Sequence, residues 1–126
     1  MDIKIFRNSI YRKQSASTAF YELQFCEKLL PAKKFVNYKN IIFWKENSLY
    51  VSVNNDDDEI FYNNYDKIFG QFGKLDYYGI NYFTKEQAAK ILDDLNRKNN
   101  LPDVETIINW LKFCVENFNG FYFLGV

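Results

Sequence analysis

The sequence has 126 residues and no histidine, and this absence narrows the chemistry open to it. Histidine is the commonest general base and metal ligand in proteins, and it activates the nucleophile in Ser-His and Cys-His pairs. Neither common spacing of a glycine-rich phosphate loop occurs, and there are only five glycines. These absences lower the expectation of catalysis, so we nominate no catalytic, cofactor-binding or metal-binding residue.

Cysteine and long hydrophobic runs are scarce too. Cys26 and Cys114 both fall in apolar patterns of helical spacing, which predicts free, buried thiols in a reducing compartment. No apolar run approaches the roughly 20 residues that a membrane helix needs. Residues 1–4 lack the start of a secretory signal. The sequence therefore predicts a cytoplasmic protein without a membrane segment.

What the sequence does contain is aromatic residues, including 13 Phe and 10 Tyr. Because 48% of the residues are hydrophobic, a chain of this length can bury a core without disulfides or a metal. We therefore expect one domain spanning residues 1–126. Phenylalanine favours the core, whereas tyrosine has a polar tip and is common at interfaces.

Two hydrophobic periods divide the chain, since alternation predicts strands and spacings of three or four predict helices. Strand patterns lie at 2–7, 41–44, 49–53, 75–83 and 121–126, with 41–44 and 49–53 forming a predicted hairpin. Helical patterns lie at 15–30, 60–72, 84–95 and 104–118. The expected fold is an α+β single compact domain, with a mostly antiparallel sheet of about five strands and three to four helices packed on it. The final, very apolar strand is expected inside the sheet.

Local signals set some of the expected boundaries. Thr84 followed by Gln87 has the form of a capping box, and Asp103 is a predicted cap of the last helix. Pro31 ends the first helical pattern. Gly79 interrupts the strand pattern 75–83, which predicts a bulge or a close backbone approach.

Four consecutive carboxylates at positions 56–59 form the most unusual local feature. A structural role explains part of it, because Asp58 is a candidate N-cap for a helix beginning near Glu59. The remaining carboxylates indicate an anionic surface that attracts a basic partner. Their spacing does not match an EF-hand calcium loop. The predicted partner-binding residues are Asp56, Asp57, Asp58, Glu59, Tyr62, Tyr65 and Asp66.

Charge is divided unevenly along a chain whose net charge is zero. Residues 1–45 hold nine Lys and Arg against three Asp and Glu, and residues 46–126 hold seven against thirteen. The basic residues are dispersed, and the acidic part would repel phosphate, so we do not expect direct binding to nucleic acid. The polarity favours recognition of a protein.

Two segments resemble small bacterial immunity proteins of contact-dependent growth inhibition and related polymorphic toxin systems. The first is DYYGINYFTKEQ at 76–87, in which a Tyr-Gly-x-Asn-Tyr strand runs into a capped helix. The second begins NWL at 109–111 and ends NGFYFLGV at 119–126. The resemblance implies a non-catalytic cytoplasmic protein that neutralises a cognate toxin C-terminal domain, often a nuclease. It carries over no interface residue.

Two other functions stay open. One is a small ligand-binding regulatory module in which the aromatic segment 77–83 lines a pocket. The other is an enzyme that uses Asp, Glu or Tyr as its acids, which a deep cleft holding two carboxylates of raised pKa would favour. The sequence does not specify an oligomeric state.

Overall fold

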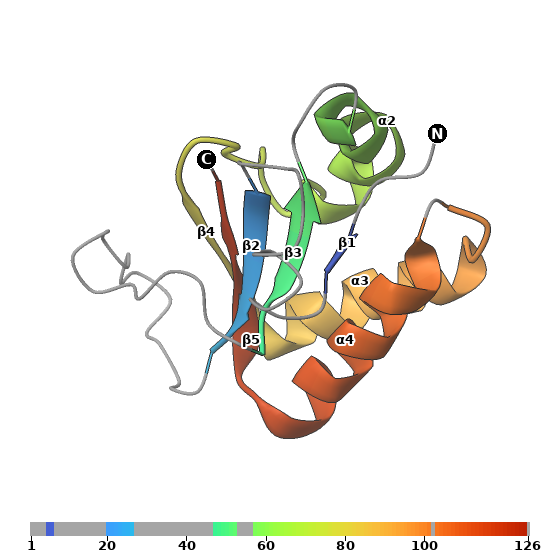
Figure 1. The fold of residues 1–126 in the computed structure, drawn as a ribbon. Helices are drawn as coiled ribbons and strands as arrows, with labels where there is room; N and C mark the ends of the chain where they lie inside the picture. Colours follow the sequence, from blue (N-terminus) through green and yellow to red (C-terminus); the bar gives the residue numbers. More distant parts are fainter. Residues whose placement is uncertain (1–4, 7–19, 27–46, 53–56, 102, 126) are drawn as a thin grey trace.

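The computed structural model describes residues 5–6, 20–26, 47–52, 57–101 and 103–125 (Figure 1). Within these residues the chain forms an α+β fold with an antiparallel sheet, as the sequence patterns predict. The strands are β1 (Ile5–Phe6), β2 (Phe20–Phe25), β3 (Leu49–Ser52), β4 (Ile80–Thr84) and β5 (Gly120–Leu124). The helices are α2 (Asp57–Phe69), α3 (Lys85–Arg97) and α4 (Val104–Asn117). None of these helices has the length and apolar character needed to cross a membrane.

The sheet has the strand order β1-β3-β2-β5-β4, and every neighbouring pair is antiparallel. The last strand, β5, pairs with β2 on one side and β4 on the other, which confirms its predicted place inside the sheet. Phe121 of β5 lies opposite both Phe25 of β2 and Phe83 of β4. The rings of Phe83 and Phe121 stack with centroids 4.7 Å apart.

All three helices contribute to one core against one face of the sheet (Figure 1). Alternate residues of β2 and β5, such as Leu23 and Phe123, face this core, as strand geometry requires. Trp110 of α4 is buried, and its indole N–H donates to the carbonyl of Asn47 at 3.0 Å. The largest fully buried side chains are Trp110, Tyr50, Tyr65, Phe61, Phe69, Phe121, Phe123, Leu23, Leu49, Ile91 and Leu95.

The two C-terminal helices begin differently. At α3 the hydroxyl of Thr84 accepts from the Gln87 N–H, and the Gln87 side chain accepts from the Thr84 N–H, which confirms the capping box. At α4 the predicted capping by Asp103 is wrong in its mechanism. Asp103 occupies the N-cap position in a left-handed conformation (φ 53°), and its side chain makes no capping hydrogen bond. Asp tolerates that conformation better than most residues.

The helix predicted at 15–30 is wrong over its described part, because Phe20–Phe25 is strand β2 and lies inside the sheet. Both faces of this strand are buried. Glu22 and Gln24 face away from the core, yet each is only 1% exposed. The Glu22 carboxylate accepts from Gln24 Nε2 at 2.9 Å and from the Ser48 hydroxyl at 2.6 Å. These hydrogen bonds offset the cost of burying the polar carboxyl group.

Two other strand predictions need correction. Residues 41–44 lie outside the described residues, but the predicted hairpin with 49–53 is wrong along Tyr50 and Val51. Those residues pair with β1 on one side and β2 on the other. The pattern 75–83 is a strand only from Ile80, because residues 77–79 form a turn. Gly79 is the last residue of that turn, not a bulge within a strand.

Candidate functional site

The helical period places Tyr62 and Asp66 at the edge of the buried face of α2. Phe61, Tyr65 and Phe69 recur on the buried face and are fully covered. Tyr62 and Asp66 are four residues apart, so they are neighbours on the helix surface. Tyr62 is 55% exposed and Asp66 is half-buried. Burial of the neighbouring face therefore fixes which side of α2 remains open.

The turn before β4 is held by its own side chains. The Asp76 carboxylate accepts the Tyr78 backbone N–H at 2.9 Å. The Asn81 side chain accepts the Asp76 N–H and donates to the Asp76 carbonyl, both at 2.8 Å. A Cβ at Gly79 would overlap the Asp76 carboxylate, so glycine permits this close approach. The turn leaves Tyr78 81% exposed, the highest value among the large hydrophobic side chains described.

Tyr77 joins the turn to α2. Its hydroxyl donates to Asp66 Oδ1 at 2.6 Å, and its ring lies 5.9 Å from that of Tyr62. On its inner side the ring contacts Tyr21 and Phe123, with centroids 5.5 and 6.1 Å away. Burial, followed by the hydrogen bond to Asp66, raises the Tyr77 pKa well above its usual range. The phenol therefore stays protonated and keeps donating to the carboxylate.

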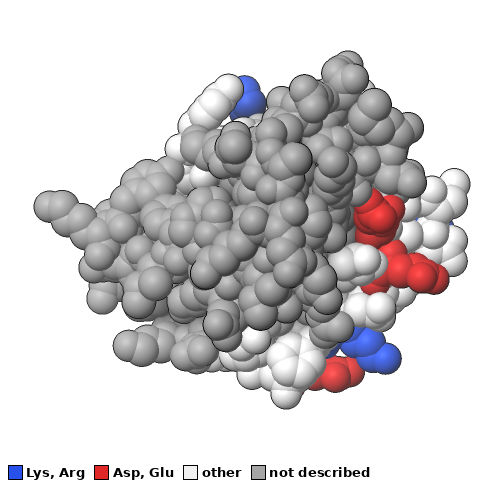
Figure 2. All heavy atoms as spheres, viewed as in Figure 1, with Lys and Arg blue, Asp and Glu red and all other residues white. Residues whose placement is uncertain are grey.

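Together these residues form what we name the tyrosine–carboxylate surface: Tyr62, Asp66, Asp76, Tyr77 and Tyr78. It combines segments ten or more residues apart in the sequence, joined through one hydrogen bond. It presents acceptor oxygens and aromatic rings side by side, which suits binding of a cationic or amphipathic group. Figure 2 shows one face of the molecule, on which Asp and Glu side chains lie at the right-hand and lower edges.

The acidic run is only partly described. Asp56 lies outside the described residues, and Asp57, Asp58 and Glu59 form the first turn of α2. Since α2 begins at Asp57, Asp58 lies inside the helix, and the prediction that it is the N-cap is wrong. Helical register puts position 59 one turn before Tyr62 and on the same side as Asp66.

Tyr65 does not belong to the candidate surface, which corrects its predicted role as a partner anchor. It is fully buried, and its ring centroid lies 5.2 Å from that of Phe61 and 6.3 Å from that of Phe69. Burial, with a smaller contribution from the charge of Asp103, raises the Tyr65 pKa above its usual range. A side chain at this position stabilises the core and is out of reach of a partner.

Of the predicted surface residues, the structure brings Tyr62 and Asp66 together, and it adds Asp76, Tyr77 and Tyr78. The alternative prediction placed the segment 77–83 in a ligand pocket, and no prediction named Asp76. The signal for a turn was the Asp-x-x-Gly spacing from Asp76 to Gly79. Contact with α2 had no local signal, because it depends on how the helix packs.

No protein-family model, curated protein or solved structure matches this chain.

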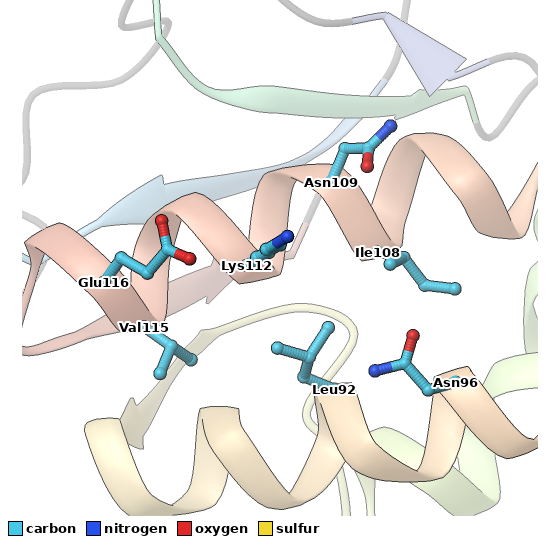
Figure 3. A pocket seen from close by; sticks show the side chains of 7 residues that line it. All are labelled: Leu92, Asn96, Ile108, Asn109, Lys112, Val115 and Glu116. Carbon is cyan, nitrogen blue, oxygen red and sulfur yellow. The ribbon is translucent and has the colours of Figure 1, made fainter.

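Residues of α3 and α4 line a groove with a volume of about 400 Å³ (Figure 3). Leu92, Ile108 and Val115 supply its apolar side chains. No ring from 77–83 lines it, so it is not the aromatic pocket of the alternative prediction. The polar lining residues are Asn96, Asn109, Lys112 and Glu116. Only one of them is a carboxylate, so the groove does not hold the carboxylate pair named in the enzyme prediction.

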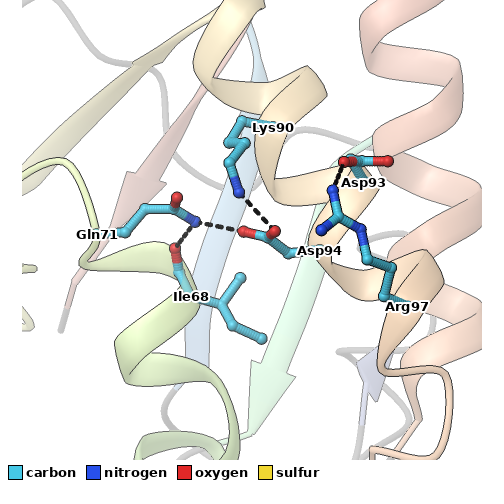
Figure 4. A network of polar contacts seen from close by, with 6 residues as sticks. All are labelled: Ile68, Gln71, Lys90, Asp93, Asp94 and Arg97. Atoms are coloured by element: carbon cyan, nitrogen blue, oxygen red, sulfur yellow. Dashed lines mark hydrogen bonds and ion pairs between the residues drawn. The ribbon is translucent and has the colours of Figure 1, made fainter.

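The adjacent carboxylates Asp93 and Asp94 are used separately (Figure 4). Asp94 accepts from Lys90 Nζ at 2.6 Å and from Gln71 Nε2 at 2.8 Å, and Gln71 also donates to the Ile68 carbonyl. Hydrogen bonds from Lys90 and then Gln71 lower the Asp94 pKa. Asp93 pairs with Arg97 on the exposed side of α3. Asp94 thus connects α3 to the residues that follow α2, while Asp93 stays on the surface of α3.

Within the described part of the chain, no group of three or more His, Cys, Asp or Glu is placed to hold a metal ion.

Proposed function

We propose that this chain is a non-catalytic immunity protein that binds a cognate toxin domain, and that the tyrosine–carboxylate surface is part of the interface. The observation that carries the proposal is the Asp66–Tyr77 contact, which places exposed Tyr62 beside the turn that presents Tyr78. The missing histidine and the resemblance at 76–87 and 109–126 point the same way.

The tyrosine rings and the carboxylates of this surface would contribute to binding in different ways. Exposed tyrosines bury a large area at low entropic cost and are common where binding energy is concentrated. Carboxylates at the rim mainly raise the association rate and exclude partners of the wrong charge. A toxin domain that acts on nucleic acid has a basic surface, which an acidic, aromatic surface would complement. We therefore propose a nuclease domain as the toxin.

Cytoplasmic neutralisation is part of the proposal. Cys26 and Cys114 are buried thiols outside any disulfide, as expected for a protein that works in a reducing compartment. The complex would form before the toxin reaches its substrate.

The direct test is purification of the tagged chain with the toxin domain encoded immediately upstream of its gene. We expect a stable complex and loss of toxin activity in it. The double variant Tyr62→Ala with Tyr78→Ala should speed dissociation, because both rings are exposed and neither supports the core. A complex whose association and dissociation rates are unaffected by this variant would place the interface elsewhere. No complex and no protection would reject the immunity function.

A ligand-binding module remains a second candidate, now favoured by the groove between α3 and α4. Its mixture of apolar and polar lining side chains has the general composition of a small-molecule site. A thermal-shift screen of metabolites on the whole chain tests it. A ligand that raises Tm and loses its effect in Ile108→Asn would support this function over toxin binding.

A further inference from the structure

Tyr62 and Asp66 each keep an unused polar group. Within the described residues, neither the Tyr62 hydroxyl nor Asp66 Oδ2 has a hydrogen-bond partner, although Asp66 Oδ1 is engaged by Tyr77. We infer that this pair receives one arginine side chain of a protein partner, its guanidinium stacked on the Tyr62 ring and hydrogen-bonded to Asp66. The inference rests on the proposed function, because it names the group that the toxin would present.

The acceptor is already oriented before any partner arrives. Tyr77 holds Oδ1 of Asp66 at 2.6 Å, and Tyr77 is itself packed against Tyr21 and Phe123 of the sheet. A carboxylate held in this way loses less conformational freedom on binding than one on a mobile side chain. Because the hydrogen bond uses one oxygen, the other remains for an incoming donor.

The spacing of the two residues favours arginine. Side chains at i and i+4 on a helix lie about 5–6 Å apart, so one planar group can touch both. A guanidinium stacks on an aromatic face and donates hydrogen bonds in its own plane at the same time. A lysine ammonium is a compact, strongly hydrated charge that makes poorer use of the ring.

The surrounding charge has the sign that an arginine requires. From Asp57 to Tyr78 the sequence holds five carboxylates and two lysines, Lys67 and Lys74. The local excess is therefore three negative charges, in a chain whose overall charge is zero. This excess would draw a cationic loop toward α2 before the specific contact forms.

The inference can be tested without a toxin. The ¹⁵N-labelled full chain is titrated with a capped tri-arginine peptide and, separately, with a capped tri-lysine peptide of equal charge. We expect shift changes centred on Tyr62, Asp66 and Tyr77, and a Kd about two- to fivefold lower for tri-arginine. Equal affinity for the two peptides, or shifts centred elsewhere, would overturn the inference.

Matched variants separate the ring, the charge and general electrostatics. Tyr62→Ala and Asp66→Asn should each weaken tri-arginine binding about two- to fivefold. Tyr62→Phe keeps the ring and should retain the arginine preference. Asp93→Asn removes an exposed carboxylate from a different helix and should leave the Kd nearly unchanged. If Asp93→Asn and Asp66→Asn act equally, attraction is diffuse and the arginine site does not exist.

The tests of the arginine site and of the immunity function can fail independently of each other. A selective arginine site in a chain that binds no toxin would reject immunity and keep the site. A toxin complex that forms without any arginine preference at Tyr62 and Asp66 would keep immunity and reject the site.

Discussion

The hydroxyl of Tyr77 donates to Oδ1 of Asp66 at 2.6 Å and so ties the turn before β4 to helix α2. Both residues belong to segments that other contacts hold in place. Asp66 lies beside the buried face of α2, and the ring of Tyr77 packs against Tyr21 and Phe123. The hydrogen bond therefore sets how the two elements present their exposed side chains.

Removing this hydroxyl should loosen the surface without unfolding the protein. Tyr77→Phe keeps the buried ring and loses a hydrogen bond to a charged acceptor, so we expect ~1–2 kcal/mol less stability in urea unfolding. Partner or peptide affinity should fall as well, because Asp66 is no longer held. Tyr82→Phe is the control, since its hydroxyl donates to the Asn119 carbonyl at 2.8 Å, away from this surface. Tyr82→Phe should lower stability and leave the affinity for the partner or peptide unchanged. If Tyr82→Phe and Tyr77→Phe lowered this affinity equally, Tyr77 would have no special role in holding Asp66.

The sequence predicted elements well where one face is buried and the other is open to water. Helix α3 is such a case, with buried Ala88, Ile91 and Leu95 and a capping box at its start. Strand β2 is the opposite case. Tyr21, Leu23 and Phe25 alternate with Glu22 and Gln24, which is the period of a strand, but the two polar residues are buried as well. Apolar residues before and after β2 then fit a helical spacing equally well.

The sequence predicted an acidic and aromatic surface on α2, but not all of the residues that form it. The acidic run pointed to α2, and Tyr62 and Asp66 follow from helical phase once the buried stripe is known. Tyr65 lies on the same helix as Tyr62, but it is four residues from both Phe61 and Phe69, so the helical period places it on the buried face, where its ring packs against theirs. The contact of Tyr77 with Asp66 is tertiary. No local spacing encodes it.

The two C-terminal helices should respond differently to loss of their first polar residue. Thr84→Ala removes the hydroxyl that accepts from Gln87, and we expect it to cost ~1 kcal/mol of unfolding free energy. Asp103→Asn should cost less than half as much, because Asp103 makes no capping hydrogen bond and Asn tolerates its left-handed backbone. Chemical denaturation of both variants gives the comparison. A larger loss for Asp103→Asn would show that its carboxylate stabilises the fold by another route.

Gly120 should be far less replaceable than Gly73, although both have positive φ (115° and 152°). A Cβ at Gly120 would overlap the carbonyl oxygen of Phe83, which is backbone and cannot move aside without breaking the β4–β5 pairing. Nothing lies within 4 Å of a Cβ at Gly73. We expect Gly73→Ala to cost ~1–2 kcal/mol from backbone strain alone. Gly120→Ala should add ~1–3 kcal/mol of overpacking to that strain. Equal costs would show that strain alone decides.

The buried thiol of Cys114 should make both its own reactivity and the stability of the protein depend on pH. Cys114 is fully buried, its Sγ lies 3.2 Å from the Gly120 carbonyl, and burial raises its pKa from 9.0 to about 12. Because only the thiolate reacts, an aromatic disulfide reagent at pH 8 should label the native chain far more slowly than the chain in denaturant.

Stability follows from the same shift in pKa. The folded pKa of Cys114 exceeds its unfolded value, so the contribution to stability is complete below pH 9 and is lost as the pH rises from about 9 to about 12. Burial also raises the pKa of Tyr82 to about 12. The contribution of Tyr82 to stability is therefore also lost as the pH rises, beginning at a slightly higher pH than that of Cys114. Urea unfolding between pH 8 and 11 should show falling stability, and Cys114→Ala should flatten the curve while lowering it at pH 8. An unchanged slope in Cys114→Ala would mean that Tyr82 and other groups, not this thiol, set the alkaline limit.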